Sequence, residues 1–245
     1  MLYPFEAMAG HSKWANIKHR KGRADAAKGK AFSRVAKEII SAVKQGGPDP
    51  KANTKLKLAI DKAKAANFPN ENIERNIKKA SSADQSDYTE MTYELYGHGG
   101  VGIIAQVMTD NKNRIASEMR IATNKKGGSV ATPGSVAFNF EEKGVIQIPK
   151  SAAKEESLFL LATEAGAEDF DSAEDLFLVI TSANELFNVR DKITEQGIAC
   201  AEANLEMIPK IYVDCDEKTA KANMALIEWI ENLDDVDAVF HNMQI

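Results

Sequence analysis

Residues 144–208 read GVIQIPKSAAKEESLFLLATEAGAEDFDSAEDLFLVITSANELFNVRDKITEQGIACAEANLEMI and carry the clearest fold signal in the chain. Apolar residues alternate in some parts of this stretch and recur at helical spacing in others. The predicted elements are, in order, strand 145–148, helix 152–165, strand 168–172, strand 176–180, helix 184–196 and strand 199–207. Ser182-Ala183-Asn184-Glu185 has the form of a capping box before the second helix. This βαββαβ order predicts a ferredoxin-like sandwich with both helices on one face of an antiparallel sheet.

The flanking segments continue the mixture of strands and helices. The elements predicted before this stretch are strands 92–96 and 101–108, helix 114–125 and strand 135–140. After Pro209, Asp214 can cap a helix that ends near Glu231, with Glu217 in the reciprocal capping position, and residues 236–240 supply a last strand. We infer that 88–141 and 209–245 form one α+β domain, into which the ferredoxin-like domain 142–208 is inserted.

The first third of the chain is predicted to be helical. Apolar residues predict an amphipathic helix over 28–45, which Gly46-Gly47-Pro48 ends. Asp49-Pro50 resembles an N-cap followed by Pro at the first position of a second helix, and a short third helix ends at Ala80. Residues 1–87 are therefore a basic tail, a three-helix module and a polar linker. The fold class is α+β, with an N-terminal basic helical domain followed by two α+β domains.

Charge is distributed very unevenly along the chain. Residues 1–80 contain 18 Lys and Arg but 7 Asp and Glu, a net charge of +11, whereas the remainder carries −16. The overall charge of −5 conceals this asymmetry. Such a split indicates a module that binds a polyanion, joined to an acidic body.

The basic tail is the strongest functional signal. Between Met8 and Arg34, eight Lys and Arg accompany one acid, Asp25, and no periodic apolar face runs through the tail. Lysines on a helix face usually do no more than contact water, but a run of this density predicts phosphate contacts. Trp14 either anchors the tail in the core of the protein or stacks on an exposed base. The candidate nucleic-acid-binding residues of this region are Lys13, Trp14, Lys18, His19, Arg20, Lys21, Lys28, Lys30 and Arg34.

A weaker second patch is predicted beside the start of the 114–125 helix. It consists of Arg114, Lys125 and Lys126. The simpler interpretation of these three residues is an ordinary solvated helix.

Other classes of function find little support in the sequence. No apolar run approaches the roughly 20 residues of a membrane helix, so no membrane partner is expected. Cys200 and Cys215 have neither metal-type spacing nor the pattern of a disulfide framework, which favours the cytoplasm. The four histidines lie in no recognisable nucleophile or zinc motif, so we expect no enzyme, no cofactor and no metal. We expect Met8 to be the natural start.

Gly97-His98-Gly99-Gly100-Val101-Gly102 satisfies the dinucleotide fingerprint G-x-G-x-x-G only in letters. That fingerprint works where a strand leads into a helix whose N-terminus receives the pyrophosphate. Here a second strand follows, so the glycines predict a hairpin turn.

Several motifs of this chain resemble those of the YebC/PmpR family, over essentially everything from Met8 onward. They include the opening Met8–His19 (MAGHSKWANIKH), Lys28–Phe32 (KGKAF), Asn72–Arg75 (NIER), Thr109–Arg114 (TDNKNR), Thr132–Phe138 (TPGSVAF) and Val239–Asn242 (VFHN). Leu95 and His98 depart from the family pattern at the Gly-rich turn, as do Val130 and Ala131 near the second Gly-Gly. The resemblance implies a helical domain followed by two α+β domains.

The resemblance also implies a regulator of gene expression. Family members are labelled DNA-binding transcriptional regulators, while a mitochondrial branch and some bacterial members act in translation, including relief of ribosome stalling at proline-rich stretches. We therefore expect a cytoplasmic DNA-binding transcriptional regulator. The alternative is a translation factor that binds ribosomal RNA, and its acidic body could face basic ribosomal proteins. A third possibility is a protein-interaction module whose acidic body does the binding.

Overall fold

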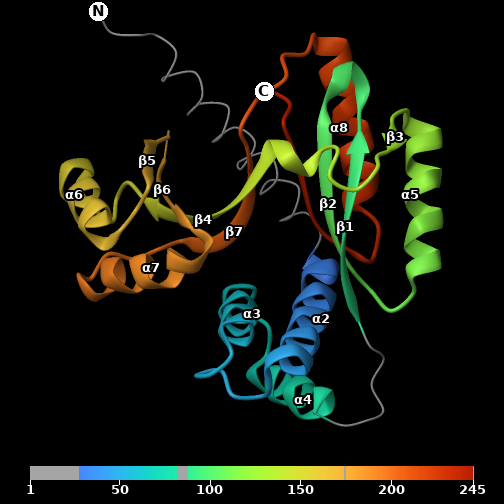
Figure 1. The fold of residues 1–245 in the computed structure, drawn as a ribbon. Helices are drawn as coiled ribbons and strands as arrows, with labels where there is room; N and C mark the ends of the chain where they lie inside the picture. Colours follow the sequence, from blue (N-terminus) through green and yellow to red (C-terminus); the bar gives the residue numbers. More distant parts are fainter. Residues whose placement is uncertain (1–27, 82–87, 174, 245) are drawn as a thin grey trace, which may run out of the picture.

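The computed structural model describes residues 28–81, 88–173 and 175–244. These residues form seven α-helices and two four-stranded antiparallel sheets, so the predicted α+β class is confirmed. Figure 1 shows the N-terminal helices below the two sheets, which lie side by side above them. No helix among the described residues is long and apolar enough to cross a bilayer.

One sheet has the predicted ferredoxin-like topology. Its strand order is β5-β6-β4-β7, and its core includes Ile146, Leu158 and Val189 between the sheet and both helices. Ser182 makes no side-chain cap, so the predicted capping box is wrong: a 3₁₀ turn, Ala183–Glu185, comes first, and Glu185 accepts from Asn188 Nδ2 at 2.6 Å. The elements are β4 (Phe140–Pro149), α6 (Glu155–Ala165), β5 (Asp169–Ser172), β6 (Leu176–Ser182), α7 (Leu186–Glu195) and β7 (Glu202–Pro209).

The other sheet has the order β3-β1-β2-β8. Its two helices pack on one face, where Met119 and Leu226 meet Ile103 of the sheet. The predicted strands at 92–96, 101–108 and 236–240 are present; the first and last are slightly longer than predicted, and the second is shifted by one residue. The elements are β1 (Thr89–Tyr96), β2 (Gly102–Thr109), α5 (Lys112–Lys126), β3 (Ser129–Val130), α8 (Glu217–Glu231) and β8 (Val236–His241).

Two sequence predictions about this sheet are wrong. Residues 135–139 form no strand: they make a turn and the 3₁₀ helix Ala137–Asn139, because their N–H groups donate to a side chain rather than to a neighbouring strand. Helix α8 begins two residues later than predicted. Asp216, not Asp214, is its N-cap, and its side chain accepts from the Thr219 N–H at 2.7 Å.

The glycine-rich segment is the hairpin expected from the sequence. Strands β1 and β2 pair with Tyr96 opposite Gly102, and Gly99 and Gly100 have φ angles of 68° and 81°. The amide of Asn223 in α8 binds the turn from both sides, accepting from His98 N–H at 2.7 Å and donating to His98 O at 3.0 Å. No helix starts here to receive a pyrophosphate.

The N-terminal helices are α2 (Lys28–Gly46), α3 (Thr54–Ala65) and α4 (Asn70–Ala80). Ile39, Leu56 and Ile73 from the three helices share one buried core. The predicted start of the second helix at Asp49-Pro50 is wrong, because the N-cap is the buried Asn53. Its Oδ1 accepts from Leu56 N–H at 3.0 Å while its Nδ2 donates to Ala42 O and Gly47 O. We call residues 28–81 the helical module and residues 88–244 the body.

Candidate nucleic-acid interface

Six of the tail residues predicted to bind nucleic acid lie outside the described residues: Lys13, Trp14, Lys18, His19, Arg20 and Lys21. Lys28 and Lys30 are in the first turn of α2. Arg34 follows one turn later, where it is half-buried and its Nη2 donates to the backbone O of Glu231 in α8 at 3.2 Å. Arg34 therefore joins the helical module to the body, and the tail remains a prediction.

The helical module is basic independently of the tail. Residues 28–81 contain 13 Lys and Arg against 5 Asp and Glu. Two groups among these cations differ in whether they contact the body, and this difference could not be read from the sequence.

One group faces the body and forms ion pairs with it. Lys37 Nζ lies 2.9 Å from Asp235 Oδ1, and Lys55 Nζ lies 3.4 Å from Glu90 Oε2. Lys57 Nζ lies 3.5 Å from Asp191 Oδ2 in α7. The two exposed pairs, of Lys55 and Lys57, contribute little singly, whereas the Lys37–Asp235 pair is largely buried. All three pairs place an opposite charge beside the cation concerned.

The body also supplies one cation to the module. Arg190 in α7 donates from Nη1 to Asp61 Oδ2 at 2.9 Å. Its guanidinium lies 4.7 Å from the ring centroid of Phe187, and Lys57 Nζ approaches the same ring at 5.7 Å. Ion pairs of both polarities therefore hold the module against the body.

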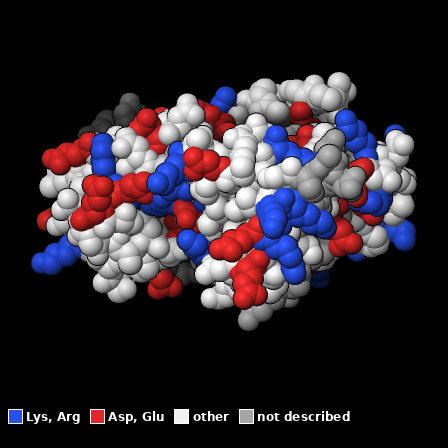
Figure 2. Space-filling view, turned by 90° about the horizontal axis from the view of Figure 1, so that it is seen from below, with Lys and Arg blue, Asp and Glu red and all other residues white. Residues whose placement is uncertain are grey.

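The second group of cations forms what we call the outer face: Lys51, Lys64, Arg75 and Lys78. All four side chains are exposed. Within the part of the chain that the structure describes, none of the three lysines has an acidic partner. Figure 2 views the molecule from the side of the helical module, where Lys and Arg side chains gather among scattered Asp and Glu. Sequence reasoning left these residues out because exposed helical lysines are usually just solvated.

The structure does not assemble the predicted second patch. Arg114 is in the first turn of α5, whereas Lys125 and Lys126 are in the last. At about 1.5 Å per residue, Arg114 and Lys125 are roughly 16 Å apart along the axis. Lys125 and Lys126 both lie 5.4 Å from the ring centroid of Trp229. These two lysines still present positive charge at one end of α5.

Arg114 instead takes part in a charged cluster around Asp235. Its Nη2 donates to Asp235 Oδ2 at 2.5 Å and to Asp110 Oδ1 at 2.8 Å. Hydrogen bonding to these two carboxylates raises the pKa of Arg114. Thr109 Oγ1 donates to the same Asp235 oxygen at 2.8 Å. The cluster joins α2, α5 and the end of β2.

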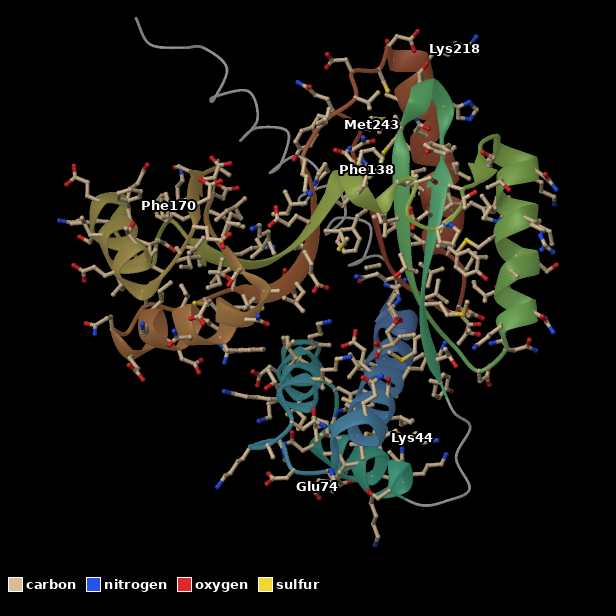
Figure 3. The ribbon with its side chains drawn as sticks, in the orientation of Figure 1. Lys44, Glu74, Phe138, Phe170, Lys218 and Met243 are labelled. Carbon is tan, nitrogen blue, oxygen red and sulfur yellow. The ribbon has the colours of Figure 1, made fainter. Side chains whose placement is uncertain are left out.

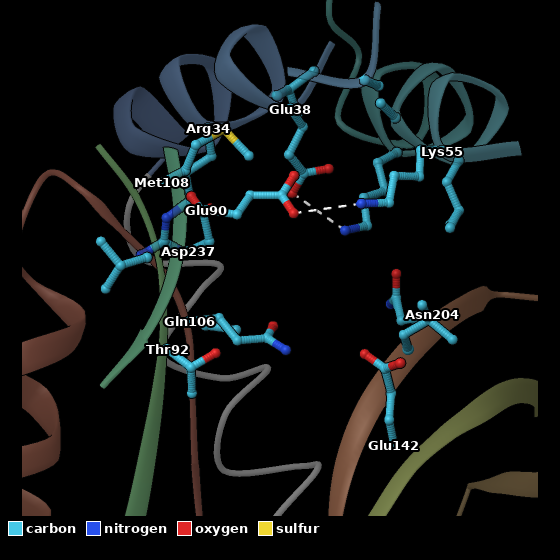
Figure 4. A pocket seen from close by; sticks show the side chains of 18 of the residues that line it. Arg34, Glu38, Lys55, Glu90, Thr92, Gln106, Met108, Glu142, Asn204 and Asp237 are labelled. Atoms are coloured by element: carbon cyan, nitrogen blue, oxygen red, sulfur yellow. Dashed lines mark hydrogen bonds and ion pairs between the residues drawn. The ribbon is translucent and has the colours of Figure 1, made fainter. Parts of the chain in front are cut away.

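A cavity of about 690 Å³ lies where the module meets both sheets. Figure 4 shows Lys55 paired with Glu90 at its upper wall, with Glu142 and Asn204 of the ferredoxin-like sheet across from them. On β8, Asp237 lines the cavity, and its buried Oδ1 has no hydrogen-bond partner among the described residues. Burial, with the nearby Glu38 carboxylate, raises the pKa of Asp237 to about 7 against the opposing charges of nearby cations.

Among the described residues, the cysteines and His98 are not arranged as an activated nucleophile or a general base. Burial raises the pKa of both Cys200 and Cys215, which is the reverse of thiol activation. His98 uses its Nε2 to contact the carbonyl of Lys126 at 2.8 Å at the hairpin turn. Among the described residues, no group of three or more His, Cys, Asp and Glu side chains could hold a metal ion.

Comparison with known proteins agrees with this architecture. Residues 12–83 match the model of the TACO1/YebC protein N-terminal domain, and residues 88–243 match that of the TACO1/YebC second and third domain. The chain belongs to the TACO1/YebC family. The resemblance seen in its motifs is thereby confirmed.

Individual relatives match along almost their whole length. A "probable transcriptional regulatory protein" of Protochlamydia amoebophila is 69% identical over 238 residues, which is 97% of each chain. One from Chlamydia pneumoniae is 60% identical, covering 96% of this chain and 100% of the relative. The crystal structure of a conserved hypothetical protein from Aquifex aeolicus is 40% identical, with a TM-score of 0.85 over 95% of this chain and 96% of that one.

Proposed function

We propose that this protein is a cytoplasmic, non-enzymatic regulator of gene expression that binds nucleic acid through its N-terminal region, as a DNA-binding transcriptional regulator. The observation that carries the proposal is that some cations of the helical module pair with the body while others are exposed to solvent. The body neutralises the cations on one side, and the outer face leaves Lys51, Lys64 and Lys78 toward solvent.

The geometry supports binding to phosphate more than to bases. Lysine side chains on a convex helical surface contact a phosphate backbone as point charges, which gives affinity without sequence information. The basic tail precedes this module in the chain and would add further phosphate contacts. The names of the relatives, probable transcriptional regulatory proteins, agree with a regulatory role.

Action on ribosomal RNA is the second candidate, because helix α4 is poorly suited to read duplex DNA. Four residues separate α3 from α4, as in a helix-turn-helix, where the start of the second helix contacts base edges. In this chain that start carries the exposed Glu71 and Glu74. Two carboxylates there would be repelled by the phosphates that border a major groove, so specific reading of duplex DNA by α4 is disfavoured.

Charge-reversal variants test the interface. In one variant Lys51, Lys64 and Lys78 become Glu, and in another Arg20 and Lys21 become Glu. The control reverses Lys218 and Lys221 on α8 of the body. We expect either interface variant to weaken binding and to flatten the log–log salt dependence by about 0.7–0.9 for each phosphate contact removed. Unchanged affinity and slope in both variants would refute the proposed interface.

A competition assay separates the two candidates. Labelled protein is bound to ribosomes and challenged with excess duplex DNA over a series of salt concentrations. Retention on ribosomes after duplex ceases to compete supports the translational role. Removal by duplex, together with a preference of about a thousandfold for one sequence, supports transcriptional control.

A further inference from the structure

The segment between β3 and β4 carries an exposed apolar side chain, that of Phe138, on a backbone held by several hydrogen bonds. Phe138 is 70% exposed, the largest value among the exposed large hydrophobic residues of the described chain. Ile211, which follows β7, is 66% exposed. Both lie at the junction of the two sheets, where β4 and β7 pair with Phe140 opposite Pro209. Figure 3 labels Phe138 at this junction.

A buried carboxylate fixes the backbone below Phe138. Glu94 on β1 is 8% exposed, and its Oε1 accepts from Gly134 N–H at 2.6 Å. Its Oε2 accepts from the N–H groups of Val136 and Ala137, both at 2.7 Å. Burial acts to raise the pKa of Glu94, but these backbone hydrogen bonds outweigh it and hold the pKa below its ordinary value. The carboxylate is therefore ionised and accepts hydrogen bonds from three backbone N–H groups of one turn.

A second set of bonds joins Phe138 to Ile211. The side chain of Asn139 accepts from Ile211 N–H at 3.0 Å and donates to Ile211 O at 2.9 Å. The Lys210 N–H donates to Asn139 O at 2.8 Å, and Lys210 Nζ lies 3.3 Å from Phe138 O. An ammonium group is thus held at the backbone carbonyl of the residue that carries the exposed ring.

We propose that Phe138 and Ile211 form a stacking platform for an unpaired nucleobase, with Lys210 placed to contact the phosphate next to it. This inference rests on the proposed nucleic-acid function and adds a second contact on the body. The turn that Glu94 fixes buries Val136 beside Ile104 and Phe140, and the same fixed backbone leaves the ring of Phe138 exposed. The same rigidity is useful for binding, because it lowers the entropy lost when a ligand is held.

The chemistry of the surroundings favours a base over a protein partner. The proposed platform has two apolar side chains and a lysine, and the polar residues Ser135 and Asn139 lie on the same segment as its ring. A hydrogen bond from Lys143 and, in smaller part, the charge of Lys210 lower the pKa of the exposed Glu141. A stable protein interface buries roughly 800 Å² on each partner, far more than two side chains provide. One ring with an adjacent cation matches the dimensions of one nucleotide, as in proteins that stack single-stranded bases on aromatic residues.

The test uses the full chain and a short single-stranded oligoadenylate RNA that contains one fluorescent purine analogue. Phe138→Ala is expected to reduce affinity roughly tenfold to a hundredfold and to abolish the quenching that stacking produces. Its salt dependence should stay unchanged, because no phosphate contact is removed. Phe138→Trp should retain both affinity and quenching. Leu160→Ala, at an exposed leucine on α6, is the matched control.

The outcomes separate the platform from the interface on the helical module. If wild-type protein binds the RNA and Phe138→Ala binds it equally with the same quenching, the platform is overturned while the proposed function stands. If wild-type protein binds neither RNA nor duplex DNA, both the platform and the proposed function are refuted. Loss of binding to the single strand in Phe138→Ala, with duplex binding unchanged, supports the platform.

Discussion

The attachment of the helical module to the body can be tested at Asp235, whose carboxylate is 3% exposed. Asp235→Asn keeps the shape of the side chain but removes the charge that Lys37 and Arg114 share. Removing one partner of a buried ion pair costs about 3–5 kcal/mol of unfolding free energy. Lys37 is only 15% exposed, whereas Arg114 is 44% exposed and keeps Asp110. We therefore expect the lower end of that range, about 3 kcal/mol.

The loss should depend on pH in a defined direction. Burial tends to raise the pKa of Asp235, but hydrogen bonds from Lys37, Arg114 and Thr109 outweigh it and lower the pKa. A carboxyl group with a lowered pKa in the folded state stabilises the protein above the unfolded-state value of about 3.9. This stabilisation is lost as the pH falls through the folded-state pKa. The difference between wild type and Asp235→Asn is thus complete at neutral pH and shrinks below about pH 4.

Urea unfolding of both proteins, followed over this pH range, measures the effect. A lower midpoint with an unchanged slope at neutral pH is the expected result. Asp214→Asn, at an exposed aspartate, is the control and should change neither. Equal midpoints for wild type and Asp235→Asn at neutral pH would refute the reasoning, as would a difference that persists undiminished in acid.

Three further substitutions test other parts of the structure. Asp237→Asn should stabilise the protein by up to about 4 kcal/mol at neutral pH, because a carboxyl with a pKa raised to about 7 weakens folding progressively as the pH rises from about 4 to 7; thermal unfolding should show the gain disappear near pH 4. Asn53→Ala removes the cap of α3 and the two hydrogen bonds that the Asn53 amide donates to Ala42 O and Gly47 O. It should lower the free energy of unfolding by about 2–3 kcal/mol in urea titrations. A loss below about 1 kcal/mol would show that these bonds do not stabilise the module. Glu94→Gln should speed hydrogen exchange at the amides of Val136 and Ala137, and unchanged rates would show that the carboxylate does not hold this turn.

Much of the fold follows from local patterns. The βαββαβ order of the ferredoxin-like sheet, the hairpin around Gly99 and the three N-terminal helices depend on alternation, helical spacing and turn residues within a few positions. The predictions fail where a side chain from elsewhere in the chain, or a different neighbouring residue, binds the backbone in place of the expected local partner. The apolar segment 135–140 predicts a strand, and nothing nearby in the sequence reveals that Glu94 binds its backbone. Asn53 displaced Asp49 as a cap because it also bonds Ala42 across the module.

The sequence alone determined that positive charge is concentrated at the N-terminus and negative charge elsewhere, since charge requires no folding to be counted. The tertiary structure decided which of these cations remain available. Lys55 and Lys78 look alike in the sequence, yet Lys55 meets Glu90 in the body while Lys78 faces solvent on α4. Pairing between groups far apart in the chain depends on how three cores pack together, and no periodicity along one helix encodes that arrangement.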